Sequence, residues 1–427
     1  MFYAYGEDIA LSVCYFGGNT ETKYQCQYEL IDGISISVEY DISDEIEAVN
    51  GLKMWTTATE FEPRDIIIAD PDSSSYYLVK SAYYSGHTAR YGSVDDRTIS
   101  IFKSNSYFKC SSLESVLSIS NSNSFSSIKI YSQEIYRQLE NSSLSYTRTD
   151  EVTQIRLKNK TEKEEVQIKL NNIDRICISD DWSCHREGRE HININLTGYI
   201  DIKLEVPALF DVIYQYLKEL AVYLQLYKPG AFRFERIQML IDEEYADYCV
   251  VFDEISIDKH SRPNSIKGKL IDFLESCYKN IPYRDGKEET RNIPYIINRR
   301  YRSIEDNFLS CFRFVECYYK RTTNLTSNID VLKRALSDHP QNLSSFSTLG
   351  SNYINEIVAL RNQYVHTGYY LKNYTLERKD RRGNVVEIYS NITFYWIYER
   401  TKLLYQLVMD IIFKAMLGYA TYNYDYR

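Results

Sequence analysis

The spacing of apolar residues changes along this 427-residue chain, and that change limits the fold more than any other feature. In roughly the first 205 residues, apolar side chains alternate with polar ones, as in 34–40, 165–170 and 191–196. After about residue 291 they recur every three or four residues, which is typical of amphipathic helices. A chain this long is also expected to form two or three domains. We therefore predict an α+β multidomain protein, with a β-rich N-terminal domain followed by an all-α helical bundle.

The expected boundaries follow these changes in pattern. Residues 1–205 predict an antiparallel sandwich or barrel-like β domain. Residues 206–290 predict a mixed connecting region, whose first helix begins near Phe210 and stops at Pro229 and Gly230. The polar run 285–290 is typical of a domain boundary. Residues 291–427 predict a bundle with helices near 301–320, from about 329, and over 353–366 and 394–417. In the first of these helices, spacings of 4, 3 and 4 define one apolar face, formed by Phe308, Phe312, Val315 and Tyr319.

The charge is unevenly distributed between these parts. The whole chain carries a net charge of −9, yet residues 291–427 hold 19 Lys and Arg against 12 Asp and Glu. An acidic N-terminal part and a basic C-terminal part are expected if only the C-terminal part contacts phosphate groups. No signal peptide and no apolar run of membrane-spanning length is apparent, and the 9 cysteines suggest reduced thiols. We therefore expect a cytoplasmic protein without a membrane span.

The stretch 361–366 places a charged residue where a helix should be apolar. Ile354, Ile357, Val358 and Val365 recur at helical spacing, and Arg361 falls near the middle of that row. A buried arginine without a partner is costly, so this face should meet a polar site or a second subunit. The same stretch supplies two further polar side chains one helical turn apart, Asn362 and His366.

These three residue types suit the cleavage of RNA by attack of a 2′-hydroxyl on the neighbouring phosphate. The guanidinium of Arg361 can bind a phosphate, and histidine titrates near neutral pH, so His366 can transfer a proton. Asn362 can orient either group. An ordinary helix with an arginine and a terminal histidine, stopped by Gly368, is the structural alternative.

The arginine, the polar residue after it and the histidine resemble the hallmark motif of the HEPN superfamily, and 304–316 resembles the opening helix of such domains. The order of a large β-rich domain and then a helical one is similar to that of ApeA-like anti-phage proteins. This resemblance implies a metal-independent endoribonuclease without a cofactor, which acts in abortive infection and cuts host or phage RNA, transfer RNA included.

The resemblance also implies a homodimer in which two motif helices face each other across a composite cleft. His366 would then act as the general acid and base, Arg361 would hold the scissile phosphate, and Asn362 would position the histidine or the ribose. The N-terminal domain would sense a phage-derived trigger. Some members keep the fold without cleaving RNA, so a non-catalytic dimerisation or RNA-binding module attached to a sensor domain is the alternative. A β protein that binds carbohydrate or peptide, with a purely structural bundle, is a third interpretation.

Other candidate sites are open to two interpretations. Glu316 either faces the cleft or forms a salt bridge. The basic loop within 371–390 either guides RNA or is simply solvated, and its RNA-binding candidates are Arg378, Lys379, Arg381 and Arg382. Four residues have a spacing that would allow a zinc site, but buried thiols and surface histidines explain them equally, namely Cys177, Cys184, His185 and His191. The predicted site includes no metal.

Overall fold

The computed structural model divides into two compact units, and each is described by itself. The first comprises residues 1–163, 171–213 and 234–253, and the second comprises 164–170, 214–233 and 254–427. Residues of the predicted connecting region 206–290 therefore belong partly to each unit. The residues that the structure describes are 12–16, 23–30, 33–41, 46–49, 52–55, 63–71, 74–90, 97–122, 124–139, 144–148, 153–157, 164–170, 172–187, 191–228, 232–241, 244–250, 268–281, 287–297, 302–368, 375–379 and 382–419.

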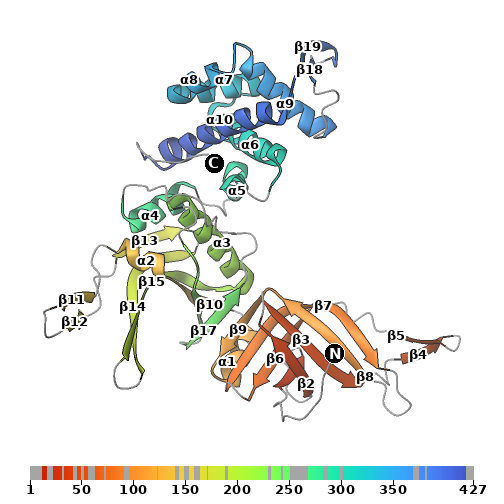
Figure 1. The fold of residues 1–427 in the computed structure, drawn as a ribbon, viewed down its shortest axis with the longest axis vertical. Coiled ribbons are helices and arrows are strands. Elements are labelled where there is room, and N and C mark those ends of the chain that lie inside the picture. Colours follow the sequence, from red (N-terminus) through yellow and green to blue (C-terminus); the bar gives the residue numbers. More distant parts are fainter. Residues whose placement is uncertain are drawn as a thin grey trace. The chain divides into compact units, whose positions relative to one another are not determined.

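The first unit contains a closed antiparallel barrel (Figure 1). Its strands follow one another in the order β7-β6-β1-β2-β3-β8, and β8 pairs back to β7. Alternate residues such as Ile34, Ile36 and Val38 point into the barrel and are buried, as the alternation in 34–40 predicts. The strand bounds are β1 (Ser12–Phe16), β2 (Tyr24–Glu29), β3 (Ile34–Asp41), β6 (Arg64–Asp70), β7 (Ser75–Arg90) and β8 (Arg97–Ser104).

The sheet continues from β7 into an open antiparallel part in the order β9-β17-β16-β10-β15-β14. One of its faces is apolar, because Ile128, Ile200 and Ile237 on neighbouring strands are all buried. These strands are β9 (Ser106–Cys110), β10 (Ser124–Ser132), β14 (Ile173–Glu187), β15 (His191–Leu209), β16 (Arg236–Ile241) and β17 (Glu244–Val250). Among its described residues, the unit also holds two helices, α1 (Leu113–Ser122) and α2 (Gln133–Gln138), and two short hairpins, β4 (Ile46–Val49) with β5 (Leu52–Trp55) and β11 (Leu144–Arg148) with β12 (Thr153–Leu157).

The second unit is mainly helical. It holds most of α3 (Phe210–Tyr227), whose sequence range crosses the division between the units. Its other elements are β13 (Glu164–Leu170), α4 (Leu270–Asn280), α5 (Glu288–Ile297), α6 (Ile304–Thr323), α7 (Asn328–Asp338), α8 (Pro340–Ser347), α9 (Tyr353–Thr367), β18 (Leu376–Lys379), β19 (Val385–Tyr389), α10 (Phe394–Asp410) and a π-helix, η5 (Ile411–Met416). The structure thus confirms a mixed α and β protein with an N-terminal barrel followed by helices.

Helix α6 is the centre of the C-terminal bundle, because it contacts α5, α7, α9 and α10. Its core face has the 4-3-4 spacing read from the sequence, and all four of those side chains are buried: Phe308, Phe312, Val315 and Tyr319. The hydroxyl of Ser303 accepts a hydrogen bond from the backbone N–H of Asp306 at 3.1 Å and caps the first turn. This helix therefore provides a rigid support for side chains on its other faces.

Two expectations for the C-terminal part are wrong. The polar run 285–290 is not simply a boundary, because Glu288, Glu289 and Thr290 form the first turn of α5. Carboxylates are favoured at a helix N-terminus, where they meet the positive end of the helix dipole, so a polar run can also begin a helix. The bundle is not all-α either, since β18 and β19 form an antiparallel hairpin between α9 and α10.

Candidate functional site

Helix α9 carries the three predicted catalytic residues. Its buried row is Tyr353, Ile357, Leu360 and Tyr364, and the ring of Tyr364 meets that of Phe308 on α6 edge to face, with 5.8 Å between centroids. The predicted apolar row therefore needs correction. Two of its members are not in the core, because Ile354 is half-buried and Val365 is 50% exposed. The tyrosines anchor the helix instead, and Arg361 lies beside the buried row rather than within it.

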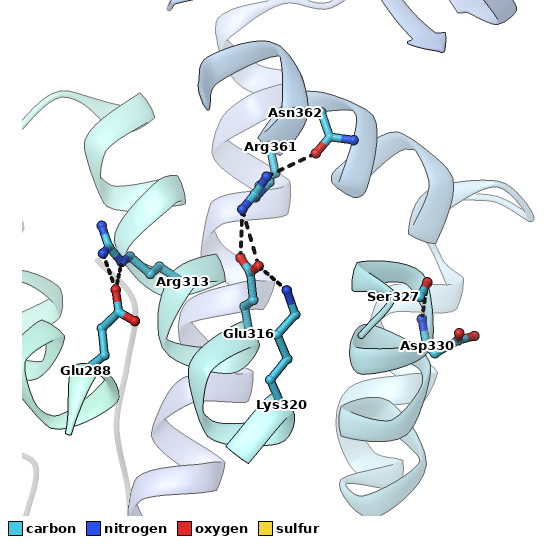
Figure 2. A network of polar contacts seen from close by, with 8 residues as sticks. All are labelled: Glu288, Arg313, Glu316, Lys320, Ser327, Asp330, Arg361 and Asn362. Carbon is cyan, nitrogen blue, oxygen red and sulfur yellow. Dashed lines mark hydrogen bonds and ion pairs between the residues drawn. The ribbon is translucent and has the colours of Figure 1, made fainter. Parts of the chain in front are cut away.

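The guanidinium of Arg361 is held by Glu316 on α6 (Figure 2). Its Nη2 donates hydrogen bonds to Oε2 and Oε1 of Glu316 at 3.0 and 3.3 Å. The same carboxylate accepts a hydrogen bond from Nζ of Lys320 at 2.6 Å. Only 20% of the Arg361 side chain and 12% of the Glu316 side chain are exposed. The partner that a half-buried arginine requires is thus present in the same chain, so its burial does not require a second subunit.

Asn362 and His366 lie on the outer side of α9. Nη1 of Arg361 donates to Oδ1 of Asn362 at 3.2 Å, so the asparagine carbonyl is directed at the arginine. Both Asn362 and His366 are exposed, and His366 lies in the last turn of the helix before Gly368. The structure therefore links Arg361 to Asn362 directly, whereas His366 is free to reach solvent or a bound molecule.

A pocket of about 630 Å³ opens beside Arg361, within the second unit. It is lined by residues of α5, α6 and α9 and by Lys287, which precedes α5. Five of the lining side chains are cationic: Lys287, Arg313, Lys320, Arg321 and Arg361. Three carboxylates line it as well, namely Glu288, Glu289 and Glu316. Guanidinium and ammonium groups gathered in one concavity are suited to binding phosphate oxygens.

Two further groups in the pocket have altered acidity. The hydrogen bonds from Arg313 lower the pKa of Glu288, so its carboxylate is ionised at neutral pH. Burial, followed by the hydrogen bond with Glu288, raises the pKa of Cys317 to about 12. Cys317 is therefore a neutral thiol at neutral pH and is poorly suited to act as a nucleophile.

Sequence reasoning found Arg361 but missed most of the pocket. The structure confirms the salt-bridge interpretation of Glu316, which also lines this pocket within the chain. Arg313, Glu316 and Lys320 are spaced three and four apart, so a search for polar groups along one face of α6 would have identified them. The pairing of Glu288 with Arg313 joins two helices and has no sequence signal of this kind.

The predicted RNA-binding residues lie on the hairpin and are partly neutralised. Arg378 pairs with Glu387 at 2.8 Å across β18 and β19, and Lys379 pairs with Glu377 at 3.4 Å. Arg382 is exposed in the turn, and Arg381 lies outside the described residues. Because Arg378 and Lys379 are both paired with carboxylates, this segment offers less free positive charge than its sequence suggests.

Cys177 and Cys184 cannot both bind one zinc ion, so the zinc site formed by all four residues is excluded. Cys177 is buried in β14, and Cys184 follows it on the same continuous strand. A strand rises about 3.3 Å per residue, so these two cysteines are about 23 Å apart and cannot bind one ion. The side chains of Cys184, His185 and His191 lie outside the described residues. Among the side chains that are described, no group of three or more His, Cys, Asp or Glu is arranged to hold a metal.

Within the described part of the chain, no helix combines the length and apolar character needed to cross a membrane. Comparisons with models of known protein families, with curated proteins and with solved structures find no match to this chain. The geometry around Arg361 and the sequence resemblance are therefore the features from which a function can be inferred.

Proposed function

We propose that this protein is a metal-independent endoribonuclease of the HEPN type that acts in the cytoplasm as an anti-phage, abortive-infection effector. The observation that carries the proposal is the position of Arg361, which is fixed by Glu316 at the wall of a pocket rich in arginine and lysine. The substrate is host or phage RNA, transfer RNA included. The N-terminal barrel unit would respond to a phage-derived trigger.

The chemistry assigns one task to each residue. A guanidinium has five N–H donors, and the contacts with Glu316 and Asn362 use only some of them, so the remaining donors can bind the scissile phosphate. His366 is exposed and can accept the proton of the 2′-hydroxyl or supply one to the leaving oxygen. Asn362, whose carbonyl is directed at Arg361, would present its amide N–H groups to the ribose or to His366.

In this proposal the protein is a homodimer, with two α9 helices facing each other. Val365 and Asn362 are exposed on the outer side of α9, which is the side that such a cleft would use. The mass in solution at micromolar concentration tests this point. A dimer is expected, and a monomer that cleaves RNA would rule out the composite cleft.

The alternative is a non-catalytic dimerisation or RNA-binding module. One observation favours it: the ion pairs of Arg361 and Lys320 with Glu316 would also stabilise a purely structural bundle. The two proposals differ in a bacterial host that expresses the wild type, His366→Ala or His366→Gln, with and without phage. The nuclease proposal expects cleaved total RNA and growth arrest with the wild type alone. Equal growth and intact RNA for all three proteins would refute it, whereas RNA binding without cleavage would support the alternative.

A further inference from the structure

The cationic groups of the pocket beside Arg361 are already occupied by carboxylates. Glu316 of α6 binds Arg361 and Lys320, whereas the other two carboxylates come from the first turn of α5. Glu288 pairs with Arg313, and Glu289 pairs with Arg321. Four of the five cations that line the pocket are therefore in contact with a carboxylate.

The contacts from α5 use the N–H groups that a phosphate would need. Oε1 of Glu288 accepts a hydrogen bond from Nε of Arg313 at 2.7 Å and another from Nη2 of the same guanidinium. Figure 2 shows this pair beside the group formed by Arg361, Glu316 and Lys320. Oε1 of Glu289 accepts from Nε of Arg321 at 2.6 Å. Because carboxylate and phosphate oxygens bind the same edge of a guanidinium, they compete for it.

The position of α5 is fixed by its apolar face rather than by these ion pairs alone. Thr290, Ile293 and Ile296 are all 1 or 2% exposed, and α5 contacts α6. Glu289 is also buried, with 2% of its side chain exposed, whereas Glu288 remains 52% exposed. The helix therefore holds two negative charges over the arginines, and the outer one can be changed without opening the core.

We propose that the first turn of α5 is an autoinhibitory acidic cap, in which Glu288 and Glu289 occupy the arginines that otherwise bind the phosphodiester backbone of RNA. This inference rests on the proposed function for its ligand. With the cap in place, three carboxylates oppose five cations in the pocket, and without it only Glu316 remains. RNA binds in competition with α5, so the cap restrains an effector whose activity would harm its own host.

The test measures binding of a short, fluorescently labelled oligouridylate by the full chain over a range of salt concentrations. All proteins carry His366→Ala, so that the probe stays intact. The first protein adds Glu288→Gln. The matched control adds Glu275→Gln, which removes a partly exposed carboxylate that is paired with Lys279 on α4 and does not line the pocket. The pair of Glu288 with Arg313 is half-exposed, so we expect Glu288→Gln to bind about two- to five-fold more tightly than the control. Its affinity should also fall more steeply with salt, because one more cation is free to bind phosphate.

A further substitution shows whether the gain arises in the pocket. Adding Arg313→Gln to Glu288→Gln should return the affinity to that of the control, because the released guanidinium is then absent. Equal affinities of the Glu288→Gln and Glu275→Gln proteins would overturn the cap. So would a gain that persists without Arg313. Cleavage is measured separately in chains that keep His366, and a binding gain without any cleavage would refute the nuclease while leaving the cap in place.

Discussion

Replacing Glu316 by glutamine tests whether this residue fixes Arg361. The substitution keeps the size of the side chain but removes the charge that accepts hydrogen bonds from Arg361 and Lys320. A hydrogen bond to a charged group contributes about 1.5–3 kcal/mol, whereas a solvent-exposed ion pair contributes about 0–1 kcal/mol. Glu316 and Arg361 are only 12 and 20% exposed, so their contact belongs nearer the first range. Lys320 is 36% exposed and adds little. We therefore expect a loss of about 2 kcal/mol.

Hydrogen exchange followed by mass spectrometry measures this loss within α6 and α9, without requiring the whole chain to unfold in one step. A decrease of about 2 kcal/mol in the free energy of local opening corresponds to roughly 30-fold faster exchange, since 1.4 kcal/mol is a factor of ten. Glu275→Gln is the control, and it should change exchange in α9 by less than about twofold. In addition, the double substitution Arg361→Gln with Glu316→Gln should lower the free energy of local opening by little more than either substitution alone. The same small effect for Glu316→Gln and for the control would refute the proposed contact.

Three further predictions concern stability. Burial lowers the pKa of His339 below its ordinary value of 6.5, so the unfolded chain binds a proton at higher pH than the folded chain does. Stability should therefore fall as the pH drops through about 6.5, and His339→Gln should lose less than the wild type between about pH 7.5 and 5.5 in thermal unfolding. Gly198→Ala should lower the free energy of unfolding of the first unit by about 3 kcal/mol or more, because the new Cβ would lie 2.3 Å from the backbone nitrogen of Tyr136. Soluble yield and circular dichroism would show this loss, and a wild-type melting temperature would contradict it. Ser303→Ala should cost about 1 kcal/mol in chemical denaturation, since it removes the cap to Asp306, and an unchanged midpoint would mean that the cap contributes nothing.

The sequence predicts the local elements better than their assembly. Alternation places Ile34, Ile36 and Val38 inside the β domain, and helical spacing places Phe308 and Phe312 in the bundle core; the structure confirms both. Closure of the barrel depends on β8 pairing with β3, which is distant in sequence, as well as with the preceding strand β7. Local periodicity contains no information on such pairing, so the choice between sandwich and barrel stayed open.

The candidate site was identified only in part for a similar reason. Arg361 was noticeable because a charge beside apolar residues needs a partner, yet the partner could not be named from its spacing. Glu316 is 45 residues away on another helix, and the two meet only because Phe308 and Tyr364 pack α6 against α9. The row assigned to α9 was only partly correct. Ile357 and Val358 are buried, but Tyr353 and Tyr364 also belong to the core face, and a strictly aliphatic pattern does not count tyrosines.

The most direct test of the proposed function is cleavage of single-stranded RNA by the purified full chain in the presence of a metal chelator, with analysis of the product ends. Attack by a 2′-hydroxyl leaves a 2′,3′-cyclic phosphate on one fragment and a 5′-hydroxyl on the other. We predict these ends for the wild type, with cleavage lost in His366→Ala and strongly reduced in Arg361→Gln. Intact RNA with the wild type, or cleavage that His366→Ala leaves unchanged, would contradict the assignment of this site as a ribonuclease.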